Sequence, residues 1–532
     1  MIDLFWSILL PIIIGIAVLL ISRRIAKPVI FLLQIMMVTI SLSNFLYVKA
    51  NGEAIQNIGG WPDFVGISLR ADLFAAVMVL LTTFLFTCMM VFSVDKDYSD
   101  NLFLSLFIIL EGLMNGIFLS NDLFNLFILL EVSTVVISIL IMFKRDSRSI
   151  YDGMLYLLIN VVAMSFFLMG IGILYKNLGI FDLHGIQSAM KGLENADSII
   201  LPYAFIITSV SLKTALMPLF SWLPKAHGTP SAPSVVSAIL SGLYVKSGVY
   251  LFIRMQTAFS SQIDTVDLFL ILGFFTATVG FVLAIAQKDI KLILAYHTVS
   301  QIGLIMMAIH MGNHQAYIGG IYHIINHAFF KSTLFLTAGM IIDRYKTRDV
   351  YKIRGVFKNM PLVSIASIFA IMGITGAPFF NGSISKYWIA YGAKDSLIEL
   401  GLIFINIGTL LSFIKYSQMF FGNHSINKAK EDPYENTAVM VMGGLCFVGG
   451  IFGSEFISFL FNMELSFAFM SYVEKMLAFI GSLIVGIIIY YVWLRKVNFR
   501  DTFNKLELSF NSMCLAITLF FSITLIYLKI TH

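Results

Sequence analysis

Seven ionisable side chains lie inside long apolar segments of this 532-residue chain. They are one carboxylate, four lysines and two histidines: Glu131, Lys213, Lys246, His323, His327, Lys331 and Lys386. A charge at the centre of a bilayer costs about 3 kcal/mol or more, so residues of this kind usually have a function. Because Glu, Lys and His can all exchange protons, the set predicts a proton relay.

Three members of the set, His323, His327 and Lys331, follow one another at a spacing of four residues. In a helix this spacing stacks their side chains on one face. A single buried lysine could instead be a static charge held by a partner. Seven ionisable groups spread over five apolar segments favour the relay over a set of separate static charges.

Two other charged residues in apolar segments are interpreted differently. Glu111 is a secondary candidate, which either assists Glu131 or pairs locally. Lys415 lies near the end of its segment, and we expect its amine to extend to the membrane surface. His323 and His327 have the i, i+4 spacing of zinc ligands, but no third ligand is identifiable, so no metal site is predicted.

The composition indicates that these residues lie in a membrane-spanning protein. Hydrophobic residues make up 58% of the chain and charged residues only 12%, about half the charged fraction of a typical soluble domain. Runs long enough to span a bilayer, roughly 20 residues each, follow one another almost from end to end. The predicted fold is therefore an all-α polytopic membrane protein.

We count sixteen apolar segments, each too long for a barrel strand and therefore predicted to be a helix. They cover residues 4–21, 29–48, 71–94, 101–119, 123–143, 151–175, 199–220, 233–255, 266–287, 291–311, 315–342, 361–391, 397–421, 437–460, 473–494 and 509–529. The first begins after an acidic residue and ends at a basic cluster, the reverse of a signal peptide, so it is predicted to be retained.

The distribution of basic residues supports this count. One alternating set of loops carries 22 Lys and Arg residues and the opposite set carries 8. Cytoplasmic loops are enriched in Lys and Arg, so the first set is predicted to face the cytoplasm. Both termini are then expected outside, in a bacterial or archaeal cell membrane.

Prolines interrupt two of the segments that carry lysines. Lys213 comes before Pro218 in one segment, and Lys386 follows Pro378 in a segment five helices later. Proline breaks a helix, and broken helices at membrane depth are tolerated where the backbone lines a polar cavity. Helices five apart run in opposite directions, so the reversed order predicts two inverted five-helix repeats, each with one broken helix.

The inverted repeats divide the chain into four predicted parts. These are an N-terminal three-helix segment (1–100), a first five-helix repeat (101–255), a second, inverted five-helix repeat (266–421) and a C-terminal three-helix extension (422–532).

Several classes of function are excluded by the sequence. The three cysteines are far apart in apolar runs and form no CxxC or iron–sulfur spacing. No glycine-rich dinucleotide loop is present, and the net charge of +5 is spread over short loops rather than over a nucleic-acid-binding stripe. We therefore expect no cofactor on this chain, no redox chemistry of its own and no nucleic-acid partner.

Four stretches, residues 211–233, 289–303, 323–335 and 373–386, resemble one family of membrane proteins. It comprises the antiporter-like subunits of respiratory complex I, the large subunits of Mrp cation/proton antiporters and the membrane arms of energy-converting hydrogenases. The resemblance covers about residues 65–425. The chain departs from the usual family pattern at Leu292, in place of an arginine, and at His297, in place of a serine.

The resemblance implies a role for each buried ionisable residue. Glu131 and Lys213 resemble the interacting carboxylate–lysine pair of the entry half, and Lys246 resembles the central lysine. His323 and His327 resemble the bridging histidines, and Lys386 the terminal lysine that faces the exit half. The resemblance also implies a hydrated axis that links these groups parallel to the membrane plane.

Three functions remain open from the sequence. The first is a proton- or Na⁺/H⁺-translocating subunit of a redox-driven complex, similar to complex I or to a membrane-bound hydrogenase. The second is a subunit of an Mrp-type Na⁺/H⁺ antiporter without redox chemistry, and the third is a solute carrier that acts alone. The first two predict homologous antiporter-like subunits and small membrane subunits as partners, and the first adds a peripheral redox arm.

Overall fold

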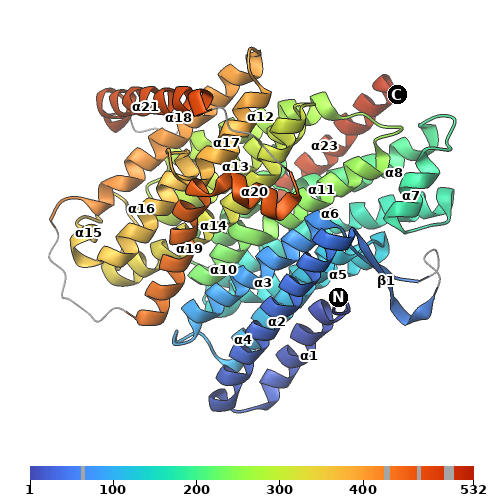
Figure 1. Cartoon of the computed structure of the whole chain (residues 1–532), viewed down its shortest axis with the longest axis horizontal. Helices are drawn as coiled ribbons and strands as arrows, with labels where there is room; N and C mark the ends of the chain where they lie inside the picture. Colours follow the sequence, from blue (N-terminus) through green and yellow to red (C-terminus); the bar gives the residue numbers. More distant parts are fainter. Residues whose placement is uncertain (62–65, 424–431, 464–468, 497–507) are drawn as a thin grey trace.

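The computed structural model describes residues 1–61, 66–423, 432–463, 469–496 and 508–532. These residues are almost entirely helical, and Figure 1 shows the helices packed side by side as a bundle. The predicted all-α membrane architecture is therefore confirmed.

The N-terminal part consists of four long helices and one short hairpin, blue in Figure 1. The helices are α1 (Trp6–Leu20), α2 (Arg23–Asn51), α3 (Leu73–Ser93) and α4 (Asn101–Leu119). Between α2 and α3, strands β1 (Ala54–Asn57) and β2 (Ser68–Ala71) pair antiparallel.

The next part contains the first broken helix. Its elements are α5 (Leu123–Ile141), η2 (Met142–Lys144), α6 (Ser147–Leu178), α7 (Leu183–Met190), α8 (Asp197–Lys213), η3 (Leu219–Ser221), α9 (Trp222–His227), α10 (Ser234–Ile239), η4 (Leu240–Tyr244) and α11 (Val245–Phe259). The turn η4 has π-helical geometry and joins α10 to α11 without a break.

The second broken helix follows in residues 266–421. The elements here are α12 (Val266–Ala286), α13 (Ile290–Ile309), α14 (His314–Tyr345), α15 (Val356–Asn359), α16 (Pro361–Thr375), α17 (Asn381–Gly392), α18 (Leu397–Ser417) and η5 (Gln418–Phe420). The C-terminal helices are α19 (Pro433–Ile451), α20 (Gly453–Phe461), α21 (Phe469–Val492) and α23 (Phe510–Thr531), with η6 (Leu494–Lys496) after α21.

Acidic or polar residues begin many of the helices. Their side chains accept a hydrogen bond from a backbone N–H of the first turn, which has no partner inside the helix. The capping residues are Asp72, Asp100, Asp122, Asp146, Asp182, Asp289, Asn313, Asp432 and Ser509. Asp72 also binds Arg254; burial raises the pKa of Asp72, but the hydrogen bonds and charge of Arg254 outweigh it and hold that pKa below its usual value.

Twelve helices are long and apolar enough to cross a membrane, or thirteen if the bent pair α19–α20 counts as one span. Each of the sixteen predicted segments contains at least one helix, but the number of sixteen spans stays a prediction. Helices α1 and α16 are apolar but have only 15 residues each. A helix of that length reaches about 22 Å, whereas the hydrocarbon core is about 30 Å thick.

The predicted segment 437–460 is not one straight helix. It forms α19 and α20, which meet at a bend of 95°. At the end of α19, Gly450 lies directly against the backbone of Phe379, where a side chain would collide. The chain turns at this close approach, which the apolar pattern of the sequence did not reveal.

The basic loops gather at one face of the bundle. Lys96 pairs with Asp343 and Glu435, and Arg348 pairs with Asp289. The two termini lie at the opposite face, where the Ile2 backbone N–H donates to Asn44 and the Asp264 backbone N–H contacts His532.

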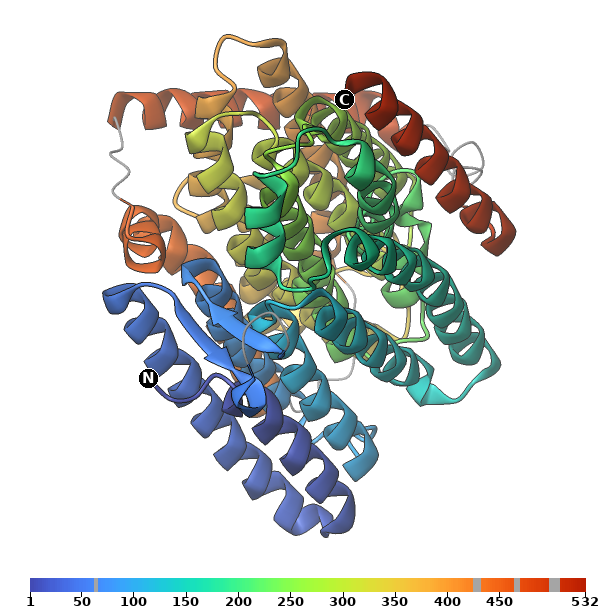
Figure 2. The ribbon, with the colours of Figure 1, turned by 90° about the vertical axis from the view of Figure 1, so that its right-hand side faces the viewer.

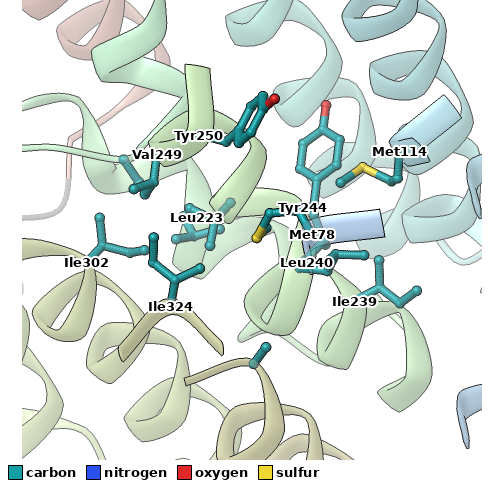
Figure 3. Close-up of a cluster of buried hydrophobic side chains, with 14 of the residues drawn as sticks. Met78, Met114, Leu223, Ile239, Leu240, Tyr244, Val249, Tyr250, Ile302 and Ile324 are labelled. Atoms are coloured by element: carbon teal, nitrogen blue, oxygen red, sulfur yellow. The ribbon is translucent and has the colours of Figure 1, made fainter. Parts of the chain in front are cut away.

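The last two long helices, α21 and α23, lie at the outside of the bundle, whereas α19 packs on α3, α14 and α16. Helix α21 packs on α18 and runs across one edge of the molecule, whereas α23 packs against α8 and α6 (Figure 2). The core lies where α3, α4, α9, η4, α11, α13 and α14 meet. Figure 3 shows Met78, Met114, Leu223, Tyr244 and Ile324 converging there.

Candidate functional site

Lys213 is the last residue of α8, directly before the first helix break. Its side chain is only 2% exposed. The Nζ atom donates to Thr134 Oγ1 at 2.7 Å and lies 3.4 Å from the hydroxyl of Tyr244. A buried ammonium needs hydrogen-bond acceptors to offset its lost hydration, and here a threonine on α5 and a tyrosine on η4 supply them.

The break itself is held by backbone contacts. Trp222 Nε1 donates to the Leu212 carbonyl at 2.8 Å, and the Met217 backbone N–H donates to Thr276 Oγ1 at 2.9 Å. Pro218 lies between the two halves, at the start of η3. The break therefore fixes the end of α8, and with it the position of Lys213.

Glu131 lies one helical turn before Thr134 on α5 and is half-buried. Its carboxylate interacts electrostatically with Lys213. No direct ion pair within 4.0 Å joins the two residues in the described part of the chain. Thr134, which accepts the hydrogen bond from Lys213, follows Glu131 by three residues on the same helix. The carboxylate–lysine pair therefore stays a prediction.

Lys246 lies just after the π-helical turn η4 and is fully buried. Its Nζ donates to the carbonyl oxygen of Ser241, and the Ser241 hydroxyl lies 2.6 Å from that of Thr298. A π-turn leaves helix carbonyls out of register with their usual donors and often marks a functional site. In this helix it presents a carbonyl to a lysine.

Helix α14 carries the stacked residues His323, His327 and Lys331, all fully buried. His323 contacts Ser385 Oγ at 2.8 Å through Nδ1 and Gln301 Oε1 at 3.0 Å through Nε2. The rings of His323 and His327 are 6.4 Å apart between centroids.

His327 lies at the centre of the cluster. Within the described residues neither ring nitrogen has a hydrogen-bond partner, while the ring interacts electrostatically with Lys246, Lys331 and His323. Lys331 itself donates to the Leu294 carbonyl at 2.6 Å. His327 thus lies near the lysine of α11 and near both other ionisable residues of this stretch of α14.

Lys386 lies on α17, in the second half of the other broken helix. Its Nζ donates to the Ile374 carbonyl at 2.8 Å and to Asn406 Oδ1 at 3.0 Å. Pro378 is part of the connection between α16 and α17. The break leaves the Ile374 carbonyl near the end of α16 free for the lysine.

A cavity of about 180 Å³ opens beside Lys386. Among its lining residues are Asn406, Tyr472 and the ion pair between Lys475 and Glu399, whose Nζ and Oε1 atoms are 3.1 Å apart. Helices α17, α18 and α21 therefore leave room for water next to the last lysine of the set.

Glu111 is not brought to this cluster. It is fully buried on α4, where Oε2 accepts a hydrogen bond of 2.6 Å from Gln34 Nε2 on α2, and Thr87 of α3 binds the same glutamine. Its contacts are local to the N-terminal helices, the second of the two alternatives left open by the sequence.

Lys415 differs from the sequence-based expectation. Its side chain is 3% exposed, and its amine donates to the carbonyls of Ile285 and Gln287. It does not extend to the membrane surface, because the end of α12 presents unpaired carbonyl oxygens that bind the amine.

The sequence analysis missed several neutral residues that hold the ionisable ones in place. These residues are Thr134, Tyr244, Gln301, Ser385 and Asn406. Each is a polar residue within an apolar segment, and Thr134 follows Glu131 at a spacing of three. That pattern could have identified Thr134, but the partners on other helices depend on the tertiary fold.

The ionisable residues of the site differ from a metal-binding group in their composition. Among the described residues no group of three or more His, Cys, Asp or Glu is placed to bind a metal ion. Lys213, Lys246, His327 and His323 are buried and Lys386 is half-buried, and neutral oxygens bind the three lysines. Such groups can accept and release a proton in turn.

Comparisons with known proteins agree with this geometry. The model of a family described as NADH:quinone oxidoreductase/Mrp antiporter, TM, matches residues 120–412. The chain is 29% identical over 387 residues to a Na⁺/H⁺ antiporter subunit of Alkalihalophilus pseudofirmus, covering 71% of this chain and 78% of that protein. It is also 29% identical over 368 residues to a NADH-quinone oxidoreductase subunit of Desulforudis audaxviator, covering 68% and 73%.

Two solved structures have the same fold. A chain of the Mrp complex from a Dietzia species matches with a TM-score of 0.79 at 20% identity, covering 95% of this chain and 99% of that one. A chain of the membrane-bound sulfane sulfur reductase, an archaeal respiratory membrane complex, matches with the same TM-score at 22% identity, covering 90% and 99%.

Proposed function

This chain belongs to the transmembrane NADH:quinone oxidoreductase/Mrp antiporter family, and we propose that it translocates protons, or exchanges Na⁺ for H⁺, as an antiporter-like subunit of a redox-driven membrane complex. The complex would be similar to complex I or to a membrane-bound hydrogenase. The electron transfer would take place on a peripheral redox arm, and homologous antiporter-like and small membrane subunits would complete the membrane part.

One observation carries the proposal: four buried ionisable residues and the half-buried Lys386 form a file between two helix breaks. It starts at Lys213, where α8 ends, and finishes at Lys386 on α17. Lys246, His327 and His323 lie between, linked by electrostatic interactions and by the contact of His323 with Ser385, the neighbour of Lys386. Buried ionisable groups are costly in a membrane, which argues against a purely structural role for all five.

The proposed step at the start of the file is a switch of Lys213 between two partners. While the Glu131 carboxylate is close, the positive charge on Lys213 is compensated. When the carboxylate moves away, the buried ammonium keeps only the neutral oxygens of Thr134 and Tyr244. An uncompensated buried charge is costly, so the proton moves on toward Lys246.

The energy required is modest. Moving one charge across a membrane potential of about 150–180 mV costs about 3.5–4 kcal/mol. Loss of a buried counter-charge is worth about 3–5 kcal/mol. Movement of the Glu131 carboxylate away from Lys213 can therefore drive one ion per half-cycle, provided that a neighbouring subunit causes it.

The membrane arrangement is part of the proposal. The basic face of the bundle would lie in the cytoplasm and both termini outside, in the cell membrane. The two breaks, with Lys213 before one and Lys386 after the other, would belong to inverted repeats 101–255 and 266–421. The parts 1–100 and 422–532 would flank them, although residues 424–431, 464–468 and 497–507 of the last part lie outside the described residues.

A second candidate is an Mrp-type Na⁺/H⁺ antiporter subunit without redox chemistry. It is favoured by the similarity to the Na⁺/H⁺ antiporter subunit of Alkalihalophilus pseudofirmus and by the Mrp-complex structure that covers 95% of this chain. Both candidates use the same buried file and differ only in what opens the Glu131–Lys213 pair.

Replacement of the first lysine tests the file. Lys213→Ala in the purified complex, reconstituted in vesicles, is expected to slow coupled ion movement by about 100-fold or more, the usual contribution of a positioned proton carrier. Lys225→Ala is the control, because Lys225 lies just after the same break and donates to the Leu508 backbone instead. Normal ion movement by the assembled Lys213→Ala complex would contradict the proposal.

Addition of an electron donor separates the candidates. A redox-driven subunit moves ions only when its complex receives electrons, whereas an Mrp-type complex exchanges Na⁺ for H⁺ under an imposed gradient alone. Transport by the single chain in vesicles, without partners, would instead identify a solute carrier that acts alone.

A further inference from the structure

His297, on α13, is buried in the same way as the histidines of the file but was given no role there. Its side chain is fully buried. Within the described residues neither ring nitrogen has a hydrogen-bond partner. A buried polar group without a partner costs about 1–3 kcal/mol, so a residue kept only for packing would better be apolar.

Other buried histidines show the contrast. His227 and His310 each place Nδ1 against the helix carbonyl four residues earlier, Leu223 and Met306. Among the buried histidines of the described segments, only His297 and the central His327 leave both nitrogens open. Both nitrogens must be available if one is to accept a proton and the other to release it.

The face of α13 that carries His297 already contacts the file on one side. Leu294, His297 and Gln301 lie at positions i, i+3 and i+7, on one helical face. The carbonyl of Leu294 binds Lys331, and the amide oxygen of Gln301 binds His323. His297 therefore lies between the two residues of α13, Leu294 and Gln301, that contact α14.

Helix α18 contacts both His297 and Lys386, the last lysine of the file. The His297 ring packs on Phe413, with centroids 4.8 Å apart. Asn406, seven residues earlier on the same face, binds Lys386. Seven residues of helix span about 10 Å, and His297 interacts electrostatically with both Lys331 and Lys386.

We propose that His297 is a second proton carrier between Lys331 and Lys386, parallel to the route through His327 and His323. The inference rests on the proposed function. One imidazole nitrogen takes a proton from the Lys331 ammonium, which leaves a neutral amine. The other nitrogen releases its proton through intervening water to the Lys386 amine, so one positive charge moves and no electrons are exchanged.

Two parallel routes predict a specific pattern of rates. In the assembled, reconstituted complex, His297→Gln and His323→Gln alone should each slow coupled ion movement by no more than about threefold, because the other route remains. The double variant should lose about 100-fold, the usual contribution of a positioned proton carrier. His310→Gln is the matched control, a buried histidine that caps the C-terminal end of the same helix outside the file, and should leave the rate unchanged.

Two outcomes would overturn the inference. One is a double variant that is no slower than His323→Gln alone. The other is a His297→Phe/His323→Gln variant, which keeps a ring against Phe413, that moves ions as fast as His323→Gln. If His297→Gln does not assemble, the His297→Phe series supplies the same comparison. Neither outcome affects the result expected for Lys213→Ala, so failure of this inference is distinguishable from failure of the proposed function.

Discussion

At the scale of single residues, neutral oxygens surround the buried lysines. Lys213 binds a threonine hydroxyl, Lys246 and Lys331 bind helix carbonyls, and Lys386 binds a carbonyl and an amide oxygen. A carboxylate in direct contact would hold each ammonium in a fixed ion pair. Neutral acceptors stabilise the charge less, which leaves each lysine able to give up its proton.

Thr134→Val tests the acceptor at the entry. Valine has the shape of threonine but no hydroxyl, and a hydrogen bond to a charged group is worth about 1.5–3 kcal/mol. We expect coupled ion movement to fall about tenfold or more, since each 1.4 kcal/mol changes a rate tenfold. Ser138→Ala is the control, because Ser138 lies on the same helix and its hydroxyl donates only to its own helix, at Val135. An equal loss in both variants would contradict a specific role for Thr134.

At the scale of elements, each break positions a lysine: Lys213 binds side-chain hydroxyls at the first break, and Lys386 binds the free carbonyl of Ile374 at the second. The half-helices of the second break are held very close together. Gly382, at the start of α17, lies against the carbonyl of Gly373 on α16, and α19 covers the break with Gly450 against Phe379. Only glycine allows such approaches, because any Cβ would meet backbone that cannot move aside.

Gly382→Ala is expected to displace α17, and with it Lys386. Overpacking costs about 1–3 kcal/mol, and the colliding atom is backbone, so the upper part of this range applies. We expect a lower midpoint in thermal unfolding of the detergent-solubilised complex, together with slower coupled ion movement. Gly444→Ala on α19 has open space for its methyl group and should change neither. A Gly382→Ala complex as stable and as active as the native one would refute the close approach.

At the scale of the whole molecule, the bundle has two different faces. Basic loops from distant parts of the sequence meet at one face through pairs such as Lys96–Glu435 and Arg348–Asp289. The termini and the less basic loops occupy the other face. The excess of Lys and Arg in the sequence thus lies on one surface, and cytoplasmic loops of membrane proteins are enriched in these residues.

Labelling of introduced cysteines tests that orientation. A Lys352→Cys variant, in the most basic loop, should react with a membrane-impermeant maleimide only after intact cells are opened. Asn195→Cys, at the face of the termini, should react in intact cells. Both residues are exposed, and the background would carry Cys514→Ser, since Cys88 and Cys446 are buried. The reverse labelling pattern would invert the proposed topology.

The sequence by itself determined the helical membrane class and the family, and it predicted the ionisable residues of the candidate site. The physical reason is that a bilayer penalises every charge and every unpaired backbone group, so exceptions such as Lys213 and Lys386 stand out in an apolar pattern. The sequence left the partner of Glu111 open and predicted the wrong surroundings for Lys415. An apolar pattern predicts that a side chain is buried, but it does not predict which helix end or side chain binds it.

Only the tertiary structure decided which residues contact the ionisable side chains of the site. Thr134 and Tyr244 at Lys213, Asn406 at Lys386 and the open nitrogens of His297 follow from the packing of helices that are far apart in sequence. The 95° bend between α19 and α20 likewise depends on what α19 packs against. Apolar periodicity reports that a helix is buried, whereas contacts between helices depend on how their surfaces fit together.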